Sequence, residues 1–227
     1  MRVLAIDTAL EACSVAVFDT ERADMRMHES LHMQRGHAEA LMPLIARVLD
    51  RAGLDFAALD RIAVTIGPGS FTGLRVGIAA ARGIALASGK RAVGLSTLAA
   101  FAAPFIANND TLPVVVAINA RHDHVYLHVF GPGGQTLVSP RLVPLREALR
   151  VSAISAPRIT GNAANILAAS WPAGERAPIS VEQRNAPNID WVARLGAAAA
   201  DTGAPPKPLY LRAPDAQPQD AARLARR

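Results

Sequence analysis

The sequence predicts an α/β protein of two related lobes, each a mixed sheet flanked by helices. Apolar runs of strand length alternate with Ala-rich segments of helix length, which is the pattern of α/β units. A Pro- and Asn-containing stretch at residues 108–113 separates two such series, and each opens with strands in succession. The 227 residues suffice for two small lobes with real cores. We expect lobes at residues 1–108 and 109–212, followed by a flexible tail at residues 213–227.

The first lobe is expected to open with three strands in a meander and then to alternate helices and strands. The predicted strands are residues 3–7, 14–18, 25–31, 62–66 and 92–95. The predicted helices are residues 37–52, 74–88 and a third that Ser96 or Thr97 caps and that runs toward Asn108. The first of these helices has one apolar face, and Gly53 is its expected C-terminal stop.

The second lobe shows weaker signals in a similar order. The predicted strands are residues 114–118, 125–130, 141–144, 158–160 and 208–211. The predicted helices are residues 145–151, a segment after Gly161-Asn162, and residues 190–200.

Charge and cysteine content bound the class of protein. The net charge of +5 weakly favours an anionic partner such as RNA, although the positive residues are scattered. Cys13 is the single cysteine, which excludes an intramolecular disulfide and a thiolate zinc cluster. No apolar run is long enough to span a bilayer, and Asp7 comes too early for a signal peptide. We expect a cytoplasmic protein without a membrane partner.

Residues 65–77 (TIGPGSFTGLRVG) form the most distinctive motif of the chain. They read as a strand, a glycine turn and the start of a helix. Such a turn aims N–H groups at one point, where an anion or another backbone segment fits. Thr72 breaks both the Walker and the dinucleotide-binding spacing, so a structural turn is favoured over a phosphate cradle.

Together with residues 4–8 (LAIDT), 13–17 (CSVAV) and 208–212 (PLYLR), this motif resembles the bacterial TsaB (YeaZ) family of tRNA threonylcarbamoyladenosine synthesis. The resemblance runs from the first residue to about residue 212. It implies a two-lobed actin-like, Hsp70-like fold. It also implies a non-catalytic subunit whose partners are the catalytic relative TsaD, the ATPase TsaE and, through the complex, tRNA.

The resemblance also bears on catalysis. The catalytic relative carries two histidines four residues apart on a helix, where both imidazoles can face one metal ion. The matching positions here are Thr97 and Phe101, and a phenylalanine ring offers no lone pair. We therefore expect no catalytic residue, no metal site and no required cofactor.

The helix after the glycine turn is the expected place of partner docking. Gly73, Gly77 and Ala81 are spaced four apart, so another backbone can approach closely along one side. Packing on the chain's own sheet is the default explanation. The resemblance shifts the prediction toward a partner helix bundle with TsaD, or with a second copy when TsaD is absent. Further apolar contributors would be Leu41, Ile45, Leu74 and Ile78.

Two alternative functions stay open. A small ATPase or kinase of the actin-like fold would bind nucleotide through six candidate residues: Asp7, Thr8, Ser14, Gly67, Gly69 and Ser70. Against it, Asp7 and Thr8 fit a simple hairpin turn, and Asn119 stands where a second carboxylate is expected. A direct RNA-binding module is indicated by charge alone. His122, His124 and His128 share an expected strand face that suits a cleft wall better than a zinc site.

Overall fold

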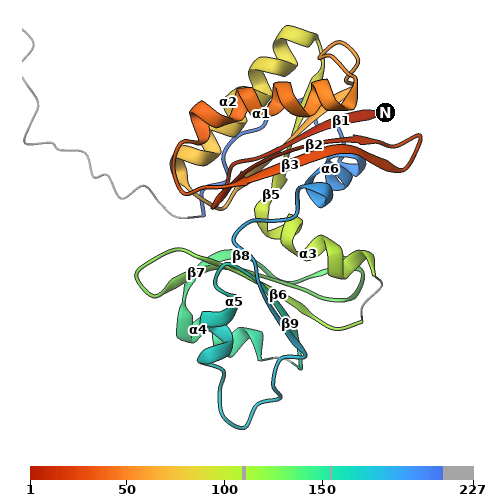
Figure 1. Cartoon of the computed structure of the whole chain (residues 1–227). Coiled ribbons are helices and arrows are strands. Elements are labelled where there is room, and N and C mark those ends of the chain that lie inside the picture. Colours follow the sequence, from red (N-terminus) through yellow and green to blue (C-terminus); the bar gives the residue numbers. More distant parts are fainter. Residues whose placement is uncertain (109–110, 154, 212–227) are drawn as a thin grey trace, which may run out of the picture.

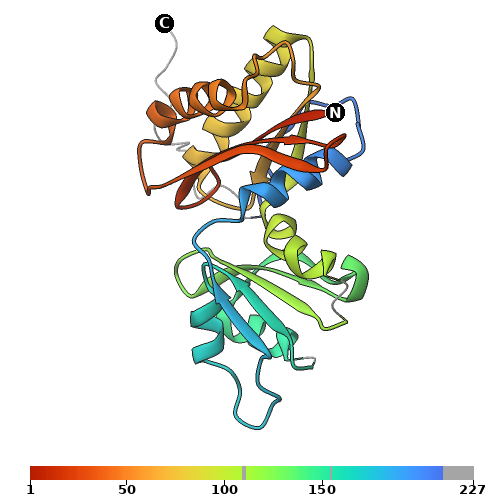
Figure 2. The same cartoon turned by 45° about the vertical axis from the view of Figure 1, so that its right-hand side comes forward.

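The computed structural model describes residues 1–108, 111–153 and 155–211. Two lobes lie one above the other, each with a five-stranded sheet (Figures 1 and 2). Helices cover the outer side of each sheet, and other helices lie between the lobes.

The first sheet has the strand order β3-β2-β1-β4-β5. Its strands are β1 (Arg2–Asp7), β2 (Ala12–Asp19), β3 (Asp24–His32), β4 (Arg61–Gly67) and β5 (Arg91–Ser96). The first three pair antiparallel, whereas β4 and β5 run parallel to β1. The helices α1 (His37–Ala52) and α2 (Phe71–Ser88) cover its outer face. Left-handed Gly53 ends α1 as expected, and left-handed Gly89 ends α2.

The second sheet repeats this topology, with the order β10-β9-β6-β7-β8. Its strands are β6 (Val114–Asn119), β7 (His124–Phe130), β8 (Thr136–Pro144), β9 (Arg158–Gly161) and β10 (Ser180–Gln183). The short helices are η1 (Pro132–Gly134), α4 (Leu145–Ser152) and α5 (Ala164–Ala169). The central strand pairs antiparallel on one side and parallel on the other, as in the first sheet. The prediction of two mixed sheets flanked by helices is confirmed.

Helices α3 (Thr97–Ala107) and α6 (Ile189–Ala198) lie between the lobes. Helix α3 packs on β6 of the second sheet, while α6 packs on β1, β2 and β4 of the first. Gly196 permits this close approach, because an added Cβ would overlap the Ala63 side chain. Residues 189–198 therefore pack with the first lobe, which differs from the expected second lobe of residues 109–212. The expected tail at residues 213–227 lies outside the described residues.

Aliphatic side chains fill the space between each sheet and its helices. Above the first sheet, Leu4, Ile6 and Val15 pack against Leu41 and other residues of α1 and α2. Below it, a second cluster joins the alternate residues of β1 and β2 to α6. A third cluster lies between the second sheet and the helices α4 and α5. Nearly all of these residues are Val, Leu, Ile or Ala, in keeping with the 4% aromatic content.

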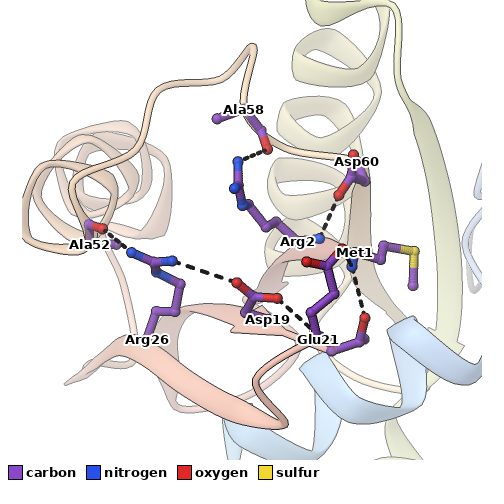
Figure 3. Close-up of polar contacts among 9 residues, drawn as sticks. Met1, Arg2, Asp19, Glu21, Arg26, Ala52, Ala58 and Asp60 are labelled. Atoms are coloured by element: carbon purple, nitrogen blue, oxygen red, sulfur yellow. Dashed lines mark hydrogen bonds and ion pairs between the residues drawn. The ribbon is translucent and has the colours of Figure 1, made fainter.

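Polar contacts fix the end of the first sheet where β1 begins (Figure 3). The Arg2 N–H donates to the Asp60 carboxylate at 2.6 Å, and its guanidinium donates to the Ala58 carbonyl. Arg26 joins Asp19, at 3.5 Å, to the last carbonyl of α1, that of Ala52. The glycine turn lies at the opposite end of the sheet, where β1 ends at Asp7.

The predicted last strand at residues 208–211 is wrong. This segment makes one backbone hydrogen bond, from the Leu209 N–H to the Ile66 carbonyl at 2.7 Å, and is not a strand. Pro205, Pro206 and Pro208 lack N–H donors, and β4 is already paired on both sides by β1 and β5. Conversely, β10 was not expected, because its four residues carry no distinctive pattern.

Candidate functional site

The β1–β2 turn and the glycine turn after β4 pack together at one end of the first sheet. The Ser70 N–H donates to the Ala9 carbonyl at 2.7 Å, and the Thr8 hydroxyl donates to the Gly73 carbonyl at 2.7 Å. Ser70 also caps α2, since its hydroxyl oxygen accepts from the Gly73 N–H. The turn motif therefore joins two segments of this chain.

Three glycines make this contact possible. An added Cβ on Gly69 would overlap the Ala9 carbonyl oxygen, and one on Gly73 the Thr8 carbonyl oxygen. A Cβ on Gly77 would overlap the Thr8 hydroxyl. Gly67 serves a different purpose: its φ of 116° lies in the region that only glycine adopts readily. These contacts agree with the structural-turn interpretation of the motif.

The residues predicted to contact a partner are buried in the chain's own core. Leu41, Ile45, Leu74 and Ile78 are at most 4% exposed, and Ala81 is fully buried. Gly73 and Gly77 face the Thr8 backbone and side chain. In this chain the set packs internally, because the small-residue stripe of α2 packs on the first sheet and its β1–β2 turn, and its contact with a partner stays a prediction.

Asp7 is a fully buried carboxylate at this junction. One carboxylate oxygen accepts the Thr65 hydroxyl at 2.5 Å and the Ala9 N–H at 3.1 Å. The other has no hydrogen-bond partner among the described residues. Burial raises the pKa of Asp7 from 3.8 to about 6, although the hydrogen bonds from Thr65 and Ala9 and the charge of His37 oppose the shift.

This raised pKa predicts a pH-dependent stability difference between the wild type and Asp7→Asn. Between about pH 4 and pH 6 the folded protein binds more protons at Asp7 than the unfolded chain, so its stability falls as the pH rises. Asparagine removes the buried charge. We expect Asp7→Asn to be more stable than the wild type above pH 6, by on the order of 2 kcal/mol, with the gap closing near pH 4.

Urea unfolding at pH 4.5 and pH 8 measures this difference. Asp24→Asn, at an exposed position of β3, is the matched control and should follow the wild type at both pH values. A constant gap between Asp7→Asn and the wild type would show that Asp7 does not titrate in this range.

The remaining candidate nucleotide-binding residues fall into two groups: those that take part in the contact between the two turns, and Ser14, which does not. The contact between the two turns occupies three of them: Thr8 and Ser70 donate hydrogen bonds across it, and Gly69 lies against the Ala9 carbonyl. Ser14 lies beside Asp7 on the paired strand and is 1% exposed. Of the candidate nucleotide-binding residues, Asp7 and Ser14 are therefore the two whose side chains do not hold the two turns together, and the glycine turn near them is occupied by contacts within the chain.

The first hairpin of the second lobe, between β6 and β7, is tightly held. The Asn119 side-chain oxygen accepts the Arg121 N–H at 2.8 Å, and the Asn119 N–H donates to Asn162 at 2.7 Å. Arg121, His122 and Asp123 all have left-handed φ values near 50–65°, which non-glycine residues seldom adopt.

The histidines of this region do not share one environment. His122 lies in the turn, so only His124 and His128 of the expected set belong to β7. His128 is 7% exposed, and burial lowers its pKa to about 4. Its Nε2 atom lies 3.2 Å from the Thr136 hydroxyl. Among the described residues, no three or more His, Cys, Asp or Glu side chains are grouped so that they could hold a metal ion.

Thr97 and Phe101 begin helix α3 and point into the core. Thr97 is fully buried and Phe101 is 2% exposed. Phe101 packs in the apolar cluster that also holds Leu98 and Val116, and its phenyl ring supplies no metal ligand.

An exposed pair of stacked aromatic rings lies at the N-terminal end of α2. The ring of Phe71, 56% exposed, stacks on Tyr210 with ring centres 5.8 Å apart. The Arg75 guanidinium lies 3.8 Å from the centre of the Phe71 ring. Met42 of α1 and Leu86 of α2 are also exposed, at 46% and 86%. The i, i+4 spacing of Phe71 and Arg75 was a usable signal, whereas Tyr210 is too distant in sequence to be assigned to this stack.

The duplicated mixed sheets define a protein of the actin-like fold. An inorganic polyphosphate/ATP-glucomannokinase from Arthrobacter has the same fold, with a TM-score of 0.50 and 12% identity over 87% of this chain. Much greater similarity is found to a structure titled YeaZ from Pseudomonas aeruginosa, with a TM-score of 0.76 and 28% identity. That alignment covers 92% of this chain and 99% of the other.

The sequence comparisons show the family. Residues 31–184 match the family described as TsaD, tRNA N6-adenosine threonylcarbamoyltransferase. The tRNA threonylcarbamoyladenosine biosynthesis protein TsaB of Escherichia coli is 39% identical over 126 residues, which is 56% of this chain. An uncharacterized protein of Mycobacterium tuberculosis is 34% identical over 95% of this chain and 94% of its own length. The chain belongs to the TsaB/YeaZ family. Its match spans about half the length of the curated TsaB relatives, 53% for the protein of Escherichia coli.

Within the described residues, no helix has the length and apolar character needed to cross a membrane.

Proposed function

We propose that this chain is a non-catalytic subunit in the formation of threonylcarbamoyladenosine in tRNA. The observation that carries the proposal is the occupation of two helix positions by Thr97 and Phe101, both buried in the core. The catalytic relatives are expected to carry histidines there. With an aromatic ring packed at one position, these two positions hold no imidazole pair with which to bind a metal ion.

In this proposal the chain docks TsaD through the outer faces of α1 and α2. Exposed apolar side chains lie on both helices, at Met42, Phe71 and Leu86. Aromatic residues and arginines, such as Phe71 and Arg75, are enriched among the residues that contribute most to binding at protein interfaces. Two copies of the chain pair through the same face when TsaD is absent, and TsaE and tRNA join the assembly with TsaD.

A small ATPase or kinase is less well supported by the site. Such an enzyme needs a phosphate-binding turn, and the glycine turn packs against Thr8 and Ala9. Asn119, in the corresponding hairpin of the second lobe, carries a neutral amide whose oxygen already accepts the Arg121 N–H.

Light scattering on mixtures of the purified chain and TsaD tests the docking. At micromolar concentration we expect a species with the summed mass of the two proteins. If each protein keeps its own mass at every mixing ratio, the docking proposal is contradicted.

A further inference from the structure

A polar cleft of about 620 Å³ opens on the face of the first sheet that carries α6. Its floor is formed by β2 and β3, with Ser14, His28, Ser30 and His32, and its wall by residues 183–190. Ser14 pairs directly with Ser30, and His32 with Ala12, so their side chains lie on one face of the sheet. Because α6 begins only at Ile189, it leaves this part of the face uncovered.

The uncharged side chains that line the cleft fall into two groups. Gln183 and Asn188 are already hydrogen-bonded within the chain, whereas the others have no such bond among the described residues. The side chains of Ser14, Ser30, His32 and Asn185 make no hydrogen bond within residues 1–108, 111–153 and 155–211. Ser14 is only 1% exposed, so its hydroxyl is almost fully withdrawn from solvent without a protein partner. A buried polar group left in this way is destabilising unless water or a ligand satisfies it. Hydroxyl, imidazole and carboxamide groups can each donate and accept hydrogen bonds.

The charged groups of the cleft and the His28 ring already have contacts within the chain. Asp190 lies 2.7 Å from the His28 ring, and Arg184 makes two hydrogen bonds to Glu182, at 2.9 and 3.1 Å. The wall is tied to the β1–β2 turn by the Glu11 N–H, which donates to the Asn185 carbonyl at 3.3 Å. The cleft thus offers many neutral hydrogen-bonding groups and no uncompensated cation for a phosphate.

We propose that this cleft binds an uncharged, hydroxyl-rich small molecule, a ribose-like polyol presented by a nucleoside or by a free pentose. The volume lies within the range of about 300–1,000 Å³ that is usual for small-molecule sites. The site does not use the glycine turn, and it does not depend on the proposed role in tRNA modification.

Isothermal titration of the full chain with adenosine, D-ribose and adenosine monophosphate tests the proposal. We expect adenosine to bind, and the monophosphate to bind within about threefold of it, because no unpaired cation faces the ligand. Binding of both adenosine and ribose supports recognition of the pentose itself, and binding of adenosine alone supports the nucleoside source. Absence of binding by both at about 10 mM overturns the proposal. A monophosphate that binds tenfold tighter than adenosine also overturns it.

Variants locate the binding. The double variant Ser14→Ala, Ser30→Ala should weaken adenosine binding by about tenfold, because it removes two neutral hydrogen bonds. Ser88→Ala is the control, since that hydroxyl donates to the Ile84 carbonyl within α2. Ser30→Ala alone, at an exposed position of the edge strand β3, keeps the test valid if the double variant does not fold. It should weaken adenosine binding about threefold, and affinity equal to the wild type in a folded variant contradicts the assignment.

Discussion

Gly73→Ala is expected to destabilise the isolated chain by about 3 kcal/mol. The new methyl group would overlap the Thr8 carbonyl oxygen, which is backbone and cannot move without displacing the β1–β2 turn. Helix propensity alone predicts the opposite sign, because alanine is favoured over glycine in a helix interior by about 1 kcal/mol. The large loss therefore reports the close contact between α2 and the turn.

Gly83→Ala is the matched control for this substitution. It lies in the same helix, and an added Cβ there has no neighbour within 4 Å. We expect this variant to be more stable than the wild type by about 0.5–1 kcal/mol. Urea unfolding of the three proteins measures both effects. If Gly73→Ala were as stable as Gly83→Ala, the glycine stripe would not pack internally. The stripe would then be available to a partner, as the sequence predicts.

The second large effect is expected for Phe71→Ala, in the affinity for TsaD. Phe71 is 56% exposed and is held between Tyr210 and Arg75, so it is preordered for contact with a partner. Its loss should raise the dissociation constant about 30-fold, which corresponds to about 2 kcal/mol. Stability should change by less than about 1 kcal/mol, because the side chain is largely outside the core.

Ile179→Ala separates a specific contact from a general loss of apolar surface. Ile179 is 57% exposed and directly precedes β10 of the second sheet, whereas α1 and α2 cover the first sheet. Titration by interferometry should give this variant the affinity of the wild type. Unchanged affinity of Phe71→Ala, together with weakened binding of Ile179→Ala, would move the docking surface to the second lobe.

Local signals in the sequence were sufficient for most elements. The helix predicted at residues 37–52 is found with the same bounds, because its apolar stripe and Gly53 are both local features. The strand, turn and helix around residues 62–88 were likewise predicted, and so was the mixed character of both sheets. The single elements depend on residues near one another in the sequence, and the mixed sheets follow from the order of the elements along each lobe.

The errors concern contacts between distant segments. The small-residue stripe of α2 was correctly recognised as a close contact, but the surface that meets it includes Thr8, 65 residues before Gly73. The helix near residues 190–200 was predicted, yet its packing on the first sheet depends on a match with Ala63 that no local pattern encodes. The stack of Tyr210 on Phe71 is a contact of the same kind. The contacts that surround the predicted site residues could therefore not be predicted from the sequence.

The central claim is that the chain supports the transfer of the threonylcarbamoyl group without carrying it out. The most direct test is the amount of threonylcarbamoyladenosine formed in tRNA by purified components that are supplied with the threonylcarbamoyl adenylate. We predict no modified nucleoside with the chain alone, and a large increase when the chain is added to TsaD and TsaE. Modification of tRNA by the chain in the absence of TsaD would contradict the account.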